Sequence, residues 1–196
     1  GGFGASSYKA REVGEAFEAM EKAFLLELVY PVVGTEIPLA PALRRAPKLI
    51  WLDGGLVNYA AKIQQEVFDA KDLLDAWRGH IAEQWVAQEL ASFSGNIGYA
   101  KRNFWVRNTP SSIAEVDFVF QYGTRVVPIE VKAGHNAHLR SLHQYMEEAS
   151  HDIAVRVWSG NYSVDEVKTN SGKIFRLVNL PFYYVGILPE VLKKLS

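Results

Sequence analysis

Two consecutive runs carry most of the structural information in this sequence, Glu115-Val116-Asp117-Phe118-Val119-Phe120 and Val127-Pro128-Ile129-Glu130-Val131-Lys132-Ala133-Gly134. Both are rich in β-prone residues, and the connection at 121–125 contains a glycine, so together they predict a hairpin. Side chains alternate between the two faces of a strand, so Glu130 and Lys132 share the face opposite Val131. Charges in such strands are costly unless they meet a metal, a substrate or one another. The runs therefore predict a charged site where the two strands meet.

The charged residues of these runs suit metal-dependent phosphodiester hydrolysis. That reaction needs a divalent cation to polarise the phosphate and generate hydroxide, and a positive group for the developing charge. Asp117 and Glu130 would supply carboxylates to Mg²⁺ or Mn²⁺, and the Val131 backbone carbonyl would add a third oxygen. Lys132 would orient the attacking water or stabilise the transition state. Glu83, expected on a preceding helix, would bind a second ion or hold the water of the first.

A structural alternative stays open for the same residues. Asp117 and Lys132 would then form an ion pair at a sheet edge, with Glu130 merely solvated. A lone Glu-x-Lys tripeptide in a strand is common and would favour that alternative. Here Glu83 precedes the other acids on an expected helix, and the acids and the lysine follow in order on two expected strands. This order favours a site.

Composition sets wider bounds on fold and function. A chain of 196 residues suits one domain, or one domain with a smaller appendage, at roughly 100–200 residues per domain. A hydrophobic fraction of 48% allows a substantial core and excludes a wholly disordered chain. The formal net charge of −1 excludes a uniformly basic nucleic-acid binder, but a local basic patch remains compatible with it.

The absence of cysteine bears on location. It excludes a disulfide framework and a thiolate metal site, and it favours a reducing, cytoplasmic compartment. No apolar run reaches the roughly 18 residues that span a bilayer, and no secretory signal opens the chain, so we expect no membrane partner.

Hydrophobic periodicity and turn residues predict helices interspersed with strands. Helices are expected at Glu12–Tyr30, Leu56–Ile63, Gly79–Leu90, Leu139–Ala149 and Pro189–Leu195. Strands are expected at Lys48–Leu52, within Ile97–Arg107, and at Asp117–Phe120, Val126–Val131, Ile153–Trp158 and Phe182–Leu188. Asp53 is expected to cap a helix or hold a turn rather than to bind a ligand. This order predicts a mixed sheet with helices packed on it.

One basic and aromatic stretch is less specific, namely Lys101, Arg102, Phe104, Trp105 and Arg107. Such a stretch would hold a nucleic-acid backbone. A half-buried strand with exposed charges is the alternative, and we favour it.

With these motifs in hand, the chain resembles the PD-(D/E)XK restriction-endonuclease-like fold, through Glu83 on a helix, Asp117 on a strand and Glu130-Val131-Lys132. Four segments, KLIWLDGGL (48–56), GHIAEQWVAQEL (79–90), EVDF (115–118) and PIEVKAG (128–134), resemble the C-terminal domain of a prokaryotic AAA-type ATPase family. That domain has long been labelled as one of unknown function. The resemblance extends from roughly Arg11 to the C-terminus.

The resemblance implies an α/β fold with a restriction-endonuclease-like core, in which helices flank a mixed central sheet and a small helical segment precedes it. Residues 1–46 would be the tail of a winged-helix-like region, opened by a cloning scar or a cut linker at Gly1-Gly2-Phe3-Gly4. Residues 47–196 would form the nuclease-like domain.

The implied function is metal-dependent phosphodiester hydrolysis of nucleic acid, with DNA favoured over RNA and with Mg²⁺ or Mn²⁺ as cofactor. The alternative is a catalytically silent DNA-binding, regulatory or interaction module. In both cases the partner would be an ATPase domain in the parent chain, and the oligomeric state stays open.

Two departures from the family patterns qualify this expectation. Ser171-Gly172-Lys173-Ile174 lacks both the upstream glycine and the following Ser or Thr of a phosphate loop, so we expect no nucleotide site and no ATPase activity from these residues. Val116 stands where the superfamily name places proline before Asp117. That position is loosely kept in the superfamily, so the change matters little.

Overall fold

The computed structural model describes residues 10–60, 62, 79–93, 102–107, 114–133 and 139–195, and within them eight strands form one sheet. The strands are β1 (Leu26–Val32), β2 (Lys48–Trp51), β3 (Asn103–Val106), β4 (Glu115–Tyr122), β5 (Arg125–Lys132), β6 (Ile153–Trp158), β7 (Ser163–Lys168) and β8 (Ile174–Pro181). The helices are α1 (Ala10–Lys22), α2 (Gly54–Ala60), α5 (His80–Ser92), α6 (Arg140–Glu148), the 3-10 helix η1 (Phe182–Ile187) and α7 (Leu188–Lys194).

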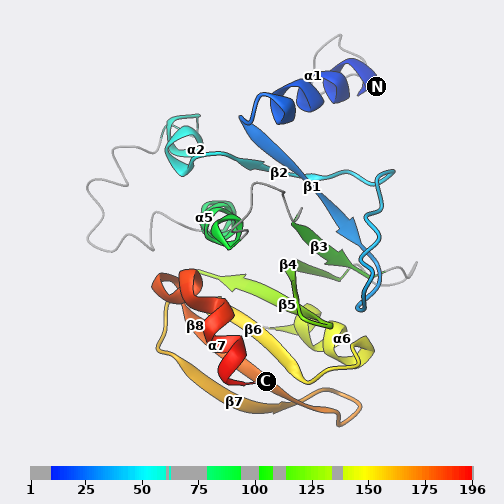
Figure 1. The fold of residues 1–196 in the computed structure, drawn as a ribbon, viewed down its shortest axis with the longest axis vertical. Coiled ribbons are helices and arrows are strands. Elements are labelled where there is room, and N and C mark those ends of the chain that lie inside the picture. Colours follow the sequence, from blue (N-terminus) through cyan, green and yellow to red (C-terminus); the bar gives the residue numbers. More distant parts are fainter. Residues whose placement is uncertain are drawn as a thin grey trace.

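The sheet is mixed, with the strand order β2-β1-β3-β4-β5-β6-β8-β7. Parallel pairs join β1 to β3, β5 to β6 and β6 to β8, and the other neighbours are antiparallel. Figure 1 shows β1 and β2 at one end of the molecule and β7 at the other. The expected α/β fold, a mixed central sheet flanked by helices, is confirmed.

A separate core covers each face of the sheet. Ile129 and Val131 pack with residues of α5, η1 and α7 in one core. Val126 packs with Leu142 and Met146 of α6 in the other. Alternation along β5 therefore turns Glu130 toward the side of α6, opposite to α5.

Several local expectations are confirmed. The hairpin of β4 and β5 turns at Gly123, whose φ of 59° lies in the left-handed region that glycine favours. Asp53 caps α2, because its side chain accepts a hydrogen bond from the Gly55 N–H. No helix in the described part of the chain is both long enough and apolar enough to cross a membrane.

The helix expected over Glu12–Tyr30 is wrong in its second half, since α1 ends at Lys22 and β1 follows. Phe24 adopts φ 58°, and its N–H donates to the Glu21 carbonyl while the Leu25 N–H donates to that of Met20. This pair of bonds is the Schellman motif that ends helices. The strand that follows buries Val29 against the sheet. The boundary between residues 46 and 47 stays a prediction, although β1 on its N-terminal side belongs to the sheet.

The strand expected over Phe182–Leu188 is also wrong. Those residues form η1 and the start of α7, and the last strand is β8, which ends at Pro181. Phe182 and Val185 are buried at a spacing of three, which matches the three residues per turn of a 3-10 helix and not the period of two of a strand. The sequence also gives no signal for β7, whose residues are exposed or only partly buried along one edge of the sheet.

Candidate functional site

The predicted charged residues lie where β4 and β5 part. Paired residues of the hairpin run from Tyr122↔Arg125 to Phe118↔Ile129. Beyond that point the Val131 N–H donates to Oδ2 of Asp117 over 2.7 Å. A side chain therefore connects the two strands at the place where the paired residues end.

The pairing of β4 with β3 is irregular at the same place. Asn103 pairs with Val119 and Trp105 pairs with Val116, so two steps along β3 match three along β4. This is a β-bulge, a feature found often beside functional sites. It lies around Asp117, whose side chain is 13% exposed.

Carboxylates from two elements surround an ammonium at this point. Lys48, the first residue of β2, places its Nζ 2.7 Å from Oε1 of Glu115, 3.2 Å from Oε2 of Glu83 and 3.6 Å from Oδ1 of Asp117. Its side chain is 20% exposed. We call Lys48, Glu83, Glu115 and Asp117 the acid cluster. Neither Lys48 nor Glu115 is among the site residues that the sequence predicts.

The Glu-x-Lys pair adjoins this cluster. Lys132 Nζ lies 2.7 Å from Oε1 of Glu130. Glu130 is only 5% exposed, and its Oε2 is buried without a hydrogen-bond partner in the described part of the chain. Because native structures rarely leave a buried polar atom unpaired, this oxygen can accept one further contact, from an ordered water or from a bound cation.

The pKa values show that these acids influence one another. Burial, followed by the charges of Glu130 and Glu83, raises the pKa of Asp117 to about 7 against the opposing effect of Lys48. Burial also raises the pKa of Glu130, although Lys132 opposes it. Strongly perturbed carboxyl groups gather at functional sites more often than elsewhere.

Burial acts on the pKa values of the two lysines with the opposite sign, but the neighbouring carboxylates outweigh it. Burial would lower the pKa of Lys48, but Glu83, Asp117 and Glu115 together outweigh it and raise that pKa. Burial would also lower the pKa of Lys132, but the hydrogen bond and the charge of Glu130 outweigh burial and raise that pKa. Both ammonium groups are therefore held in their charged form.

All four predicted site residues meet in this region, in two contacting sets. Glu83 and Asp117 face Lys48, and Glu130 faces Lys132. Within the described ranges, no three or more acids or histidines are arranged so as to hold a metal ion directly. The donors nevertheless fit Mg²⁺ or Mn²⁺ in kind, since they are hard carboxylate oxygens and one of them is buried and unpartnered. The Val131 carbonyl as a ligand stays a prediction.

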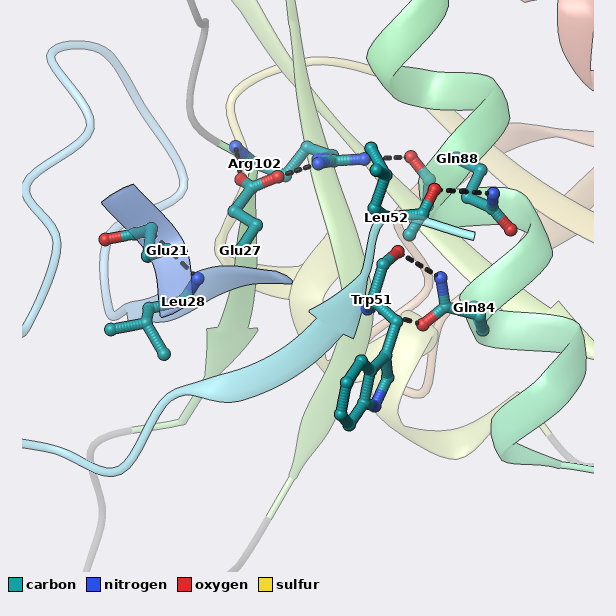
Figure 2. Close-up of polar contacts among 9 residues, drawn as sticks. Glu21, Glu27, Leu28, Trp51, Leu52, Gln84, Gln88 and Arg102 are labelled. Carbon is teal, nitrogen blue, oxygen red and sulfur yellow. Dashed lines mark hydrogen bonds and ion pairs between the residues drawn. The ribbon is translucent and has the colours of Figure 1, made fainter. Parts of the chain in front are cut away.

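Two glutamines fix α5 against β2 and thereby set the position of Glu83. The Gln84 side chain accepts from the Trp51 N–H over 2.9 Å and donates to the Trp51 carbonyl over 2.6 Å. Gln88 donates to the Leu52 carbonyl over 2.9 Å. Figure 2 shows both side chains reaching from α5 to the strand backbone. Because this helix carries Glu83 and this strand begins at Lys48, the clamp holds those two charges in register.

A cavity of about 360 Å³ adjoins the acid cluster. Its lining residues are Lys48, Leu49, Ile50, Trp51, Val57, Glu83, Gln84 and Glu115. The Lys48 side of the cluster is therefore open to solvent-sized molecules and ions.

The basic and aromatic stretch contains the strand β3, as the favoured interpretation predicts, but the expected half-burial and exposed charges are wrong, because Asn103, Phe104 and Trp105 are buried and the described arginines are paired. Arg102 forms an ion pair with Glu27 and donates to the Ala87 carbonyl, as Figure 2 shows in part. Arg107 pairs with Glu148. Lys101 lies outside the described residues.

Comparison with known proteins adds a family. A family model described as "Domain of unknown function (DUF4143)" matches residues 78–183. No curated protein and no solved structure matches the chain. The matched range includes Glu83, Asp117, Glu130 and Lys132 but not Lys48.

Proposed function

Because this chain belongs to the DUF4143 family of domains of unknown function, its activity has to be inferred from its own geometry, and we propose metal-dependent phosphodiester hydrolysis of nucleic acid. The observation that carries the proposal is Oε2 of Glu130, a buried carboxylate oxygen without a partner among the described residues. It lies beside Lys132 and within the electrostatic influence of Asp117. An acid so placed suits a hard cation.

Each residue has a role in this proposal. Asp117 and Glu130 would hold Mg²⁺ or Mn²⁺, together with the Val131 carbonyl, and Glu83 would bind a second ion or hold the water of the first. The bound cation would polarise the phosphate and lower the pKa of an attacking water. Lys132 stays protonated because its pKa is raised, so it would donate to the phosphate oxygens and stabilise their developing charge rather than remove a proton.

The surface next to Lys132 supports a nucleic-acid substrate. Lys132 lies opposite Trp158 in the register of the neighbouring strands β5 and β6. The guanidinium carbon of Arg156 lies over the Trp158 ring, 4.0 Å from its centre. Trp158 in turn pairs with Pro181, after which η1 presents Tyr183, 74% exposed, and Tyr184, 39% exposed. Exposed aromatic rings stack on bases, and arginine contacts the backbone. Following the resemblance of the sequence, we also propose a PD-(D/E)XK-type domain that works beside an ATPase domain in the parent chain.

The decisive experiment measures cleavage of end-labelled DNA and RNA while Mn²⁺ or Mg²⁺ is titrated from zero to millimolar. Asp117→Asn and Lys132→Met are expected to reduce cleavage about 100-fold or more, since each removes a ligand or a charge-stabilising donor. Asp152→Asn is the matched control, because Asp152 pairs with Arg176 outside the acid cluster. Equal cleavage by wild type and both site variants would contradict the proposal.

A catalytically silent nucleic-acid-binding, regulatory or interaction module is the second candidate. It is favoured by Lys48, whose ammonium already contacts three carboxylates where a cation would otherwise bind. In that case DNA binding would persist without cleavage, and millimolar Mn²⁺ would leave the melting temperature unchanged.

A further inference from the structure

Lys48 has no role in hydrolysis as proposed above, although it makes more charged contacts than any other residue of the acid cluster. Three carboxylates lie within 3.6 Å of its Nζ. The ammonium also lies 5.0 Å from the centre of the Phe104 ring and 6.0 Å from that of Phe118. A strongly hydrated cation on a flexible stem is thus held in a largely buried, acidic setting.

We propose that Lys48 is the built-in cation of the acid cluster, and that a divalent cation binds there only by displacing the Lys48 ammonium from Glu83 and Asp117. This inference rests on the proposed function, because it takes those carboxylates to be metal ligands. It makes Lys48 a residue that sets metal affinity rather than a catalytic residue.

Geometry makes the two cations exclusive. Glu83 and Asp117 direct oxygens at Lys48 Nζ, over 3.2 and 3.6 Å. A divalent ion such as Mg²⁺ would need those oxygens at about 2.0–2.1 Å and in its own octahedral arrangement. Two positive centres among the same oxygens repel each other strongly in a setting with little water. The ammonium therefore has to leave before the ion is fully coordinated.

The displaced Lys48 ammonium could lie beside Glu115 in the adjoining cavity. Glu115 is its closest partner, at 2.7 Å, and the most exposed of the three, with 42% of its side chain accessible. The cavity of about 360 Å³ is lined by both Lys48 and Glu115. A side-chain rotation would carry the ammonium into that cavity while its contact with Glu115 persists.

The backbone does not need to move for this exchange. Gln84 bonds both the N–H and the carbonyl of Trp51, three residues after Lys48, and so fixes β2 to α5. The displacement is then confined to the Lys48 side chain.

The test is the dissociation constant of Mn²⁺, measured on the whole chain by electron paramagnetic resonance of free Mn²⁺ and by calorimetry. Lys48→Met keeps an apolar stem over Phe104 but removes the charge, and it should lower the Mn²⁺ Kd about ten-fold or more relative to wild type. Lys48→Arg keeps the charge and should leave the Kd near or above the wild-type value.

Lys173→Met is the matched control. Lys173 is also partly buried, but its Nζ donates to the Met146 and Ala149 carbonyls at the end of α6, so this variant should leave the Kd unchanged. If Lys48→Met fails to fold, Lys48→Gln gives the same prediction with a polar side chain that still bonds Glu115.

The outcomes separate this inference from the proposed function. Tighter Mn²⁺ binding by the neutral variants, with Lys173→Met unchanged, supports it. Mn²⁺ binding of equal strength in wild type and in the neutral variants overturns it and leaves the proposed function standing. An absence of Mn²⁺ binding in every variant overturns both.

Discussion

At the scale of single residues, Asp117 is the most constrained member of the site. One of its oxygens accepts from Val131 on the neighbouring strand, and the other faces Lys48. Its pKa is nevertheless raised, because burial and the neighbouring acids outweigh these two favourable contacts. The folded protein therefore bears a cost for ionising this carboxyl, a cost that a bound cation would relieve.

This cost predicts how stability depends on pH. The pKa of Asp117 is about 7 in the folded protein and roughly 3.9 in the unfolded chain. Below about pH 4 both states are protonated, and as the pH rises toward 7 the unfolded chain loses its proton first, which favours unfolding. Asp117→Asn mimics the protonated carboxyl. With EDTA present, the free energy of unfolding of Asp117→Asn should exceed that of wild type. The difference should grow between about pH 4 and 7, to the order of 2–4 kcal/mol.

Urea unfolding of both proteins across that range measures the effect. Asp152→Asn is the control with the opposite sign, since burial would raise the pKa of Asp152 but its bonds to Arg176 outweigh burial and lower it. Stability contributed by Asp152 is present at neutral pH and is lost as the pH falls. A gain for Asp117→Asn that shrinks with rising pH would contradict the assignment.

At the scale of elements, the contact of α5 with β2 positions half of the acid cluster. Gln84 is 3% exposed, and its amide bonds both polar groups of the Trp51 backbone. This also covers part of the outer edge of β2, a terminal strand in the sheet order. A polar side chain thus stands in for a neighbouring strand.

Gln84→Ala should lower the free energy of unfolding by about 1–3 kcal/mol, because it removes two part-buried hydrogen bonds to the backbone of Trp51. Gln88→Ala removes one partly exposed bond to Leu52 and should cost about 0.5–1.5 kcal/mol. Equilibrium urea unfolding compares the two directly. Equal losses in the two variants would show that Gln84 does not act as a clamp.

At the scale of the whole molecule, the site lies at the midpoint of the sheet. The four strands β2-β1-β3-β4 lie on one side of the boundary between β4 and β5, and the four strands β5-β6-β8-β7 lie on the other. Lys48 and Glu115 come from the first group, and Glu130 and Lys132 from the second. The β5, β6 and β8 strands are parallel and end at a common edge, which brings Lys132 into line with Trp158 and Pro181.

If nucleic acid binds along that edge, its aromatic residues should contribute to affinity without affecting the metal. Tyr184 contacts Tyr183 and Tyr162, with ring centres 4.7 and 6.4 Å away. Tyr184→Ala should weaken binding of single-stranded DNA by about 1–3 kcal/mol, measured by fluorescence anisotropy, and leave the Mn²⁺ Kd unchanged. Tyr59→Ala is the control, an exposed tyrosine on α2. An equal effect of both variants would argue against binding at this edge.

Local signals in the sequence predicted the parts of the fold and site that depend on near neighbours. The hairpin, α5 and the placement of Glu130 and Lys132 on one face of β5 each depend on residues a few positions apart, whereas the ion pair between Glu130 and Lys132 was not predicted, since the structural alternative paired Lys132 with Asp117. Lys48 meets Glu83 from 35 positions away, and no periodicity reports such a contact. The strand β7 was not predicted because a polar edge strand has no hydrophobic pattern. The strand β1 was not predicted because its apolar residues also fit helical spacing.

The bulge at Asp117 has a consequence for how this strand is compared with others. Alternation counted back from Phe118 would place Val116 on the same face, yet Phe118 packs with α5 and Val116 packs with α6. The alternation of β4 side chains between the two faces of the sheet thus shifts by one residue at the site. An alignment that matches this strand to a relative by hydrophobic rhythm alone would be one position out on one side of Asp117. It would then assign the role of Glu115 to the wrong residue.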